Sequence, residues 1–243
     1  MQDVAVCIPA KDEADRIAAT VKAAQELPGA DLVVVIDDGS SDGTGRVARE
    51  AGARVVRHSR NRGKGAAMET GAEAVRLLDE GRDQPRHLLF LDADLAETAS
   101  GAAPLVEPVR AGEADMTIAV FTTTVKLGGH GFVVRLSRDG IRRATGWEAT
   151  APLNGQRCLT RAAFDAALPL AAGFGVETAL TVDLLRKGFR VAEVEVPLAH
   201  RATGTDWRSQ LHRARQFRDV ARALAVREPA VARRLDRLRG SRR

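Results

Sequence analysis

Short apolar runs alternate with amphipathic segments along the first half of the chain. The runs of strand length lie at residues 4–8, 32–36, 53–57, 87–91 and 116–121. Runs of this kind are typical of strands that are buried on both faces, and the segments between them, such as 14–26 and 66–78, carry apolar residues at helical spacing. The alternation predicts βαβ units, and therefore an α/β fold with a Rossmann-like, mainly parallel sheet and helices on both faces.

The second half of the chain is less regular. Residues 122–131 are rich in Thr and Gly and carry Lys126 and His130, which predicts a loop. Further elements are predicted as a helix over 133–145, a short strand over 154–159, helices over 161–167 and 177–187, and a strand over 190–196. From Asp206 onwards apolar residues recur at spacings of three and four, which predicts basic amphipathic helices at the C-terminus.

Composition narrows the class of protein. The chain has 243 residues, of which 44% are hydrophobic, and this suits one large α/β domain with an appendage. No apolar run reaches the ~18 residues of a membrane span, and the first residues lack the features of a signal peptide. Cys7 and Cys158 are too far apart in the sequence for a metal-type pair. We therefore expect a reduced, cytoplasmic protein.

The net charge of +5 is concentrated in the tail. Residues 201–243 contain 13 arginines and four acidic residues, a net charge of +9, which leaves −4 for the first 200 residues. The predicted tail helix carries its arginines opposite an apolar stripe that includes Trp207 and Phe217. Packing on the same domain, a homodimer, and a peripheral contact with the inner face of an anionic membrane all fit this pattern. A nucleic-acid surface is not expected, because no aromatic stacking platform accompanies the charge.

Polar and acidic residues follow the predicted strands. In a parallel sheet, ligands bind beyond the carboxyl ends of the strands, which here are residues 9–13, 37–41, 60–65 and 92–94. The phosphate-binding motifs G-x-x-x-x-G-K-[ST] and G-x-G-x-x-G are absent from these ends. Asp92 and Asp94 would lie on the same side of an extended chain. Because Mg²⁺ takes one or two protein carboxylates together with substrate phosphates, these two residues predict a site for a nucleotide diphosphate.

Four of these segments, VCIPAKDE, VVIDDGSSDGT, NRGKGAAMETG and LFLDADLAE, closely resemble the family 2 glycosyltransferases of the GT-A fold. Within that family, the chain is most similar to polyprenyl-phosphate sugar transferases and glucosyl-3-phosphoglycerate synthases. The resemblance implies transfer of a sugar from a nucleotide-diphosphate sugar, with Mg²⁺ or Mn²⁺ as the cofactor. It also implies that residues 1–125 bind the nucleotide sugar, that 126–205 form the acceptor side of the same domain, and that 206–243 form a basic helical tail.

The resemblance further implies roles for single residues. Substrate contacts are implied for Pro9, Ala10, Glu13, Asp38, Gly63, Lys64, Asp92, Ala93, Asn154, Gln156, Arg157 and Arg201. Among these, Asp38 would accept a hydrogen bond from the base, and Asp92 would contact the ribose or the sugar. Lys64 could equally be a solvated charge, and Asn154, Gln156 and Arg157 could equally satisfy backbone groups in a loop.

The same resemblance implies the catalytic and metal-binding groups. Asp94 would bind the metal, His200 in Ala199-His200-Arg201 would be a second metal ligand, and Asp94 and Glu177 would be the catalytic residues. Glu177 could instead simply favour the N-terminus of its helix. His200 could instead be an ordinary surface histidine.

The chain departs from the family pattern at two points. Ala96 and Glu97 follow the D-x-D-L segment where many relatives have Gln, and Thr178 follows Glu177 where relatives often have the Asp of a Glu-Asp base. A phosphate acceptor is already ionised and needs no base, so the absence of the Glu-Asp base favours a small phosphorylated acid or a polyprenyl phosphate as the acceptor. The alternatives are a catalytically degenerate protein of the same fold that binds a nucleotide or a partner, and a sugar-nucleotide pyrophosphorylase.

Overall fold

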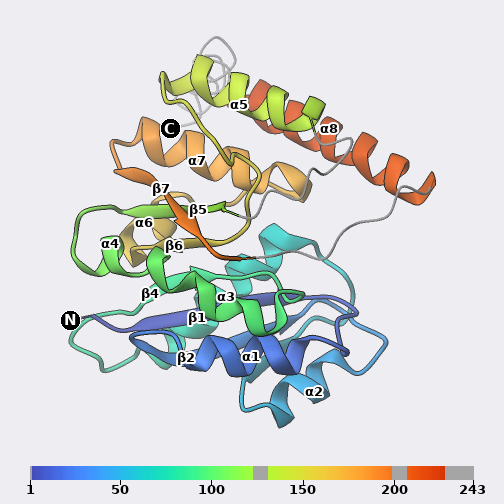
Figure 1. Ribbon diagram of the computed structural model, residues 1–243, viewed down its shortest axis with the longest axis vertical. Coiled ribbons are helices and arrows are strands. Elements are labelled where there is room, and N and C mark those ends of the chain that lie inside the picture. Colours follow the sequence, from blue (N-terminus) through green and yellow to red (C-terminus); the bar gives the residue numbers. More distant parts are fainter. Residues whose placement is uncertain (1, 123–130, 199–206, 228–243) are drawn as a thin grey trace, which may run out of the picture.

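A seven-stranded sheet forms the centre of the computed structural model, which describes residues 2–122, 131–198 and 207–227 (Figure 1). The strands are β1 (Val4–Ala10), β2 (Ala30–Asp37), β3 (Arg54–Arg57), β4 (His87–Phe90), β5 (Met116–Phe121), β6 (Arg157–Leu159) and β7 (Val191–Val196). Their order in the sheet is β3-β2-β1-β4-β6-β5-β7. All neighbours are parallel except β6, which runs antiparallel to both β4 and β5. The predicted α/β fold with a mainly parallel sheet is confirmed.

Strand β1 is longer than predicted, because it continues through Pro9 to Ala10. Its pairing with β4 covers only Val4–Cys7, whereas its pairing with β2 continues to Ala10 opposite Asp37. At Pro9 the strand therefore has a neighbour on one side only. Proline is tolerated there because its missing N–H can face the open side of the strand.

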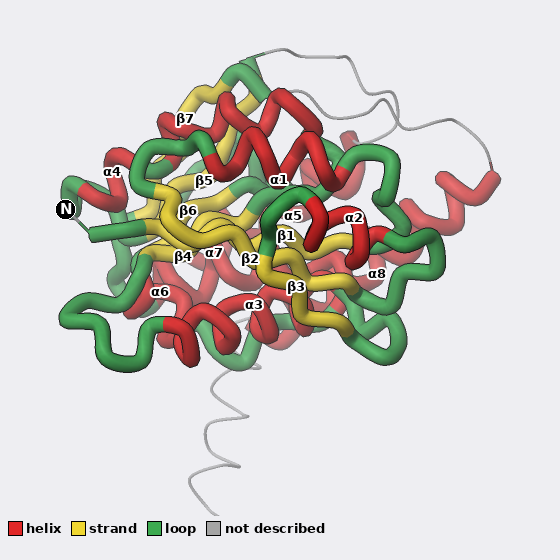
Figure 2. Tube along the Cα trace, turned by 90° about the horizontal axis from the view of Figure 1, so that it is seen from below, coloured by secondary structure: helices red, strands yellow, loops and turns green. Residues whose placement is uncertain are grey.

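Helices cover both faces of the sheet, as Figure 2 shows from below. One face packs on α1 (Ile17–Gln25), α2 (Thr44–Glu50), the 3₁₀ helix η1 (Ala96–Leu105) and α4 (Glu107–Arg110). The other face packs on α3 (Lys64–Leu78), α6 (Arg161–Ala166) and α7 (Val176–Arg186). Alternate residues of β1 enter the two cores, Val6 and Ile8 on one side and Ala5 and Cys7 on the other, as the period of two in a strand requires.

Two further helices form a third layer over α7. Helices α5 (Gly131–Thr145) and α8 (Trp207–Arg227) lie side by side at the top of the molecule (Figure 1). Val133 and Ile141 from α5 pack with Val220 and Leu224 from α8 on Val182 of α7. The tail helix therefore packs on its own domain. Within the described ranges, no helix is both long enough and apolar enough to cross a bilayer.

Candidate active site

A cavity of about 650 Å³ opens at the carboxyl ends of the central parallel strands. Seven residues that were predicted from the sequence line it: Pro9, Ala10, Asp38, Gly63, Lys64, Asp92 and Glu177. They come from the ends of β1, β2 and β4, from the start of α3 and from the first turn of α7. Phe174, which lies in the 3₁₀ helix η2 (Gly173–Gly175), and Arg215 of α8 complete the far side of the cavity.

Lys64 is the central charge of this cavity. Its Nζ lies 2.7 Å from Oδ1 of Asp92 and 3.1 Å from Oε1 of Glu177. Burial by itself would lower the pKa of Lys64, but the two carboxylates outweigh burial and hold this pKa above its ordinary value. Lys64 is therefore a cation, and it ties the loop after β4 to the start of α7.

The second oxygen of Asp92 is also held. Oδ2 accepts a hydrogen bond of 2.8 Å from Nε2 of Gln156, which is fully buried. Gly155 lies directly beneath the ion pair, because a Cβ at this position would overlap Nζ of Lys64 and would lie 3.0 Å from Oδ1 of Asp92. The segment before β6 thus fixes Asp92 by a side-chain amide and by the close approach of its backbone.

Asp38 is buried and organises the loop that leads into α3. Its Oδ1 accepts hydrogen bonds from the N–H of Arg62 and from Nδ1 of His58, and its Oδ2 accepts one from the N–H of Gly63. Nε2 of His58 lies 2.9 Å from the hydroxyl of Thr70. Because an ionised carboxylate only accepts hydrogen bonds, Nδ1 of His58 carries a proton.

The loop after β1 is joined to the loop after β2. Asp12 has a left-handed backbone (φ 56°), and its Oδ1 accepts a hydrogen bond of 2.8 Å from the N–H of Ser41. The N–H of Glu13 donates to Oγ1 of Thr44. Glu13 is thus placed through its backbone, and it is not among the described residues that line the cavity.

Beyond the end of β4, burial still alternates through the D-x-D segment: Leu91, Ala93 and Leu95 are buried in one core, whereas Asp92 and Asp94 are both half-buried, which agrees with their expected placement on one side of the chain. Strand β4 ends at Phe90, and the chain turns at Ala93 and Asp94. Helix α1 holds the turn, because Oγ1 of Thr20 donates to the carbonyl of Ala93 and Nη1 of Arg16 donates to the carbonyl of Asp94. Asp92 lines the cavity, whereas Ala93 and Asp94 are not among the described residues that line it.

Arg157 satisfies backbone groups, which is one of the two alternatives that the sequence left open for it. Its side chain is fully buried, and its guanidinium donates to the backbone carbonyls of Pro152, Asn154 and Glu177. Burial lowers the pKa of Arg157 to about 10, an effect that the Glu177 and Glu193 carboxylates oppose. Asn154 and Gln156 are likewise outside the cavity lining, and Asn154 Oδ1 accepts the N–H of Gln156.

The arrangement of an acidic strand edge around a central lysine can be compared with known proteins. Residues 5–165 match the family model described as Glycosyl transferase family 2. The chain belongs to this family.

Individual relatives support this family 2 assignment. The chain is 34% identical over 211 residues to glycosyltransferase AglJ of Haloferax volcanii, an alignment that covers 83% of this chain and 65% of AglJ. The chain thus spans less than two thirds of the length of that relative.

Solved structures of one enzyme have the same fold. The glucosyl-3-phosphoglycerate synthase of Mycobacterium tuberculosis, in complex with Mn²⁺, UDP and phosphoglyceric acid, superposes with a TM-score of 0.75 at 26% identity, covering 93% of this chain and 78% of that one. Its complex with Mg²⁺ and UDP gives a TM-score of 0.72 at 26% identity, with coverage of 93% and 79%. The predicted GT-A fold of this family 2 chain is confirmed.

Of the two predicted metal ligands, Asp94 lies within the described residues and His200 does not. His200 and Arg201 lie outside the described residues, as do Lys126 and His130. Among the residues that the structure does describe, no group of three or more His, Cys, Asp or Glu side chains could hold a metal ion. The carboxylate of Asp94 is half-buried, and Mg²⁺ needs only one or two protein carboxylates when a phosphate supplies further oxygens.

Sequence reasoning did not single out His58, which holds Asp38, or Arg215, which lines the cavity. His58 directly follows β3, and its position at a strand end was a signal that could have identified it. Arg215 was assigned to the basic face of the tail helix, but it lines the cavity. No local signal distinguishes Arg215 from its neighbours, because the packing of α8 on η2 decides which arginine reaches the site.

Proposed function

We propose that this chain transfers a sugar from a nucleotide-diphosphate sugar to a phosphorylated acceptor, with Mg²⁺ or Mn²⁺ as the cofactor. The observation that carries the proposal is the cavity at the strand ends of a family 2 chain, in which Lys64 is held between Asp92 and Glu177. A similar fold binds Mn²⁺, UDP and phosphoglyceric acid in the M. tuberculosis synthase. The chain offers both carboxylates and cations to the groups of such a donor.

In this proposal, Pro9, Ala10 and Asp38 receive the nucleoside. Oδ1 of Asp38 already accepts two hydrogen bonds, whereas Oδ2 accepts one. Since each carboxylate oxygen has two acceptor sites, Oδ2 can accept a further hydrogen bond from an N–H of the base. His58 and the N–H of Gly63 keep the carboxylate in this orientation.

Lys64 and Asp92 then act on the sugar side of the donor. Asp92, which is fixed by Lys64 and Gln156, would accept hydrogen bonds from ribose or sugar hydroxyls. Lys64 would place a positive charge near the diphosphate. The two carboxylate partners of Lys64 belong to two different elements, and together they position the lysine before the donor arrives. A cation that is already in position favours electrostatic stabilisation of the departing diphosphate.

Asp94 and His200 are the residues that we propose for the metal. Asp94 offers hard carboxylate oxygens, while Asp92 is already committed to Lys64 and Gln156. When bound, the divalent ion would supply neutralisation of the charge on the leaving diphosphate.

The proposed acceptor is a phosphate. The carboxylate of Glu177 is paired with Lys64 and is only 8% exposed, which suits a residue that positions Lys64 better than one that removes a proton. A phosphate acceptor is already ionised and requires no general base. Phosphoglyceric acid in the M. tuberculosis complex supports a small phosphorylated acid, and a polyprenyl phosphate is the second acceptor to be tested.

A thermal-shift screen of nucleotide sugars, with and without Mn²⁺, tests donor binding, because a ligand that binds only the folded state raises the melting temperature. We expect at least one donor to raise it more with Mn²⁺ than without. Transfer from that donor is then measured with 3-phosphoglycerate and, in detergent, with farnesyl phosphate. Transfer would also exclude the degenerate alternative.

The matched variants are Asp94→Ala and Asp83→Ala. Asp83 is exposed and belongs to the loop before β4, at the opposite end of the sheet. We expect Asp94→Ala to abolish metal-dependent turnover without changing the melting temperature of the free protein, and Asp83→Ala to behave as the wild type. Full activity of the Asp94→Ala variant would refute the assignment of the metal site.

A further inference from the structure

Arg215 is a cation of the cavity that has no acidic partner among the described residues. Within the part of the chain that the structure describes, three cationic side chains line the cavity: Lys11, Lys64 and Arg215. Lys11 lies 2.7 Å from a carboxylate oxygen of Asp12, and Lys64 is shared by Asp92 and Glu177. No hydrogen bond or ion pair joins Arg215 to another of the described residues, and its side chain is exposed. An anion that enters the cavity therefore finds one guanidinium whose charge is not already compensated.

The position of Arg215 is set by the contact between α8 and η2. Oδ2 of Asp219, one helical turn after Arg215, accepts the N–H of Phe174. Gly173 and Gly175 allow this approach, since a Cβ on Gly173 would overlap Asp219 and one on Gly175 would lie 2.6 Å from the Asp219 carbonyl oxygen. Helix α8 is thereby held against the rim of the cavity, with Arg215 over it.

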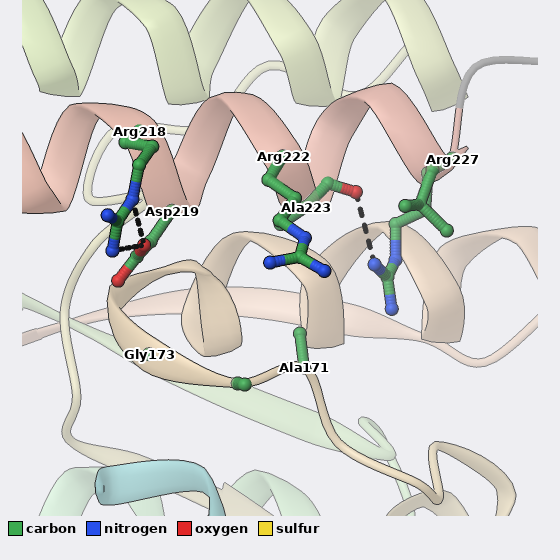
Figure 3. Close-up of a pocket in the computed structure, with 9 residues that line it drawn as sticks. Ala171, Gly173, Arg218, Asp219, Arg222, Ala223 and Arg227 are labelled. Carbon is green, nitrogen blue, oxygen red and sulfur yellow. Dashed lines mark hydrogen bonds and ion pairs between the residues drawn. The ribbon is translucent and has the colours of Figure 1, made fainter.

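Neighbouring arginines of α8 face a different cavity. Figure 3 shows this second cavity, of about 500 Å³, where Arg218 turns towards Asp219 and Arg227 donates to the carbonyl of Ala223. Arg222 also lines it, two turns beyond Arg215 and, like Arg215, without a partner among the described residues. Arg222 is therefore a matched control, because it is an exposed, uncompensated arginine of the same helix that lies outside the candidate active site.

We propose that Arg215 binds the phosphate group of the acceptor and so selects a phosphate monoester over the corresponding alcohol. The inference rests on the proposed function and adds the residue that recognises the acceptor. A guanidinium suits this task, because its planar fork can donate two hydrogen bonds to one phosphate. Lys64 is already paired with Asp92 and Glu177. In this proposal Lys64 acts on the diphosphate of the donor, and Arg215 binds the phosphate of the acceptor.

The binding of phosphate esters to the complex of this protein with UDP and Mn²⁺ tests the inference. Titration calorimetry measures the dissociation constants of 3-phosphoglycerate and of farnesyl phosphate, and the dissociation constant of UDP serves as the control. The proteins are the wild type and the Arg215→Ala, Arg215→Lys and Arg222→Ala variants. Charge-assisted hydrogen bonds contribute about 1.5–3 kcal/mol, which corresponds to about 10- to 100-fold in affinity. We expect Arg215→Ala to weaken the binding of the phosphate monoester by this factor and the binding of UDP by much less. Arg215→Lys should restore part of the loss, and Arg222→Ala should bind as the wild type.

The two phosphate esters also distinguish the sources of the phosphate. Binding of 3-phosphoglycerate alone indicates a small acid as the acceptor, and binding of farnesyl phosphate alone indicates a lipid; either result supports a phosphate site at Arg215 if the Arg215→Ala variant weakens it. Binding of neither ester by the wild-type UDP complex overturns the inference, as does an equal loss in the Arg215→Ala and Arg222→Ala variants. Failure of the proposed function would appear differently, as the absence of any nucleotide sugar that stabilises the wild type.

Discussion

Lys64 and Asp92 form an ion pair of 2.7 Å across the mouth of the cavity, although they lie on opposite sides of β4 in the sequence. Neither side chain is more than a third exposed, so solvent screens the pair only partly. Gln156 holds the other oxygen of Asp92, and Glu177 is the second partner of Lys64. The site is therefore a connected polar network, in which removal of one member leaves its partners unpaired.

A double-mutant cycle should reveal the coupling of this pair. Lys64→Met leaves two carboxylates without their cation, and we expect the free energy of unfolding to fall by about 1–3 kcal/mol. After Asp92→Asn, the same Lys64→Met change should cost less, with a coupling energy of about 1 kcal/mol or more. Urea unfolding of the four proteins measures it. Single-variant effects that add within about 0.5 kcal/mol would mean that the pair contributes no coupling.

His58 should be required for the binding of the nucleotide as well as for stability. His58→Leu removes the donor to Oδ1 of Asp38, a buried acceptor whose loss of a partner costs about 1–3 kcal/mol. We expect both weaker UDP binding by calorimetry and a lower midpoint of urea unfolding. Thr70→Val, which removes only the contact to Nε2 of His58, should have the smaller effect on UDP binding. Wild-type affinity in His58→Leu would contradict the role of Asp38 in the nucleoside pocket.

His87 should make the protein less stable at mildly acidic pH. Its ring is buried at the start of β4, and its Nδ1 has no hydrogen-bond partner among the described residues. Burial, with a smaller effect of the Arg110 charge, lowers the pKa of His87 below its ordinary value of 6.5. The unfolded chain therefore binds a proton more readily than the folded protein, so the contribution of His87 to stability is complete above pH 6.5 and is lost as the pH falls through the lowered pKa.

His87→Leu should remove this dependence. We expect the variant to be at least as stable as the wild type at pH 7.5, because an unpaired buried polar atom is replaced by an apolar group. Its advantage over the wild type should grow between pH 7 and pH 5 in urea unfolding experiments. An advantage that does not change over this range would show that His87 titrates equally in the folded and unfolded states.

The strand ends of the site were predictable because each combines two local signals. An apolar run of strand length is followed at once by polar or acidic residues, as at Asp38 and Asp92. In a parallel sheet such ends meet at one edge, so these residues could be brought together before any contact was known. The turn at Ala93 and Asp94, in contrast, could not be predicted locally, because the carbonyl of Ala93 is held by Thr20 of a distant helix.

Arg157 and Arg215 show why charged residues of the second half could not be assigned in the same way. The sequence around each arginine predicts its secondary structure but not its surroundings: Arg157 is fully buried among backbone carbonyls, whereas Arg215 faces the cavity. The antiparallel insertion of β6 between β4 and β5 buries Arg157. The contact of α8 with η2 directs Arg215 to the site.

The local pattern of residues was thus sufficient for the order of strands and helices, for the acidic edge of the sheet and for the family resemblance, because periodicity and strand-end motifs are properties of neighbouring residues. The pairing of Lys64 with Asp92 and Glu177, the burial of Arg157 and the exposure of Arg215 to the cavity required the folded chain. A charged side chain takes its partners from elements that are far away in the sequence, and the packing of those elements decides which charges are compensated and which remain to bind a ligand.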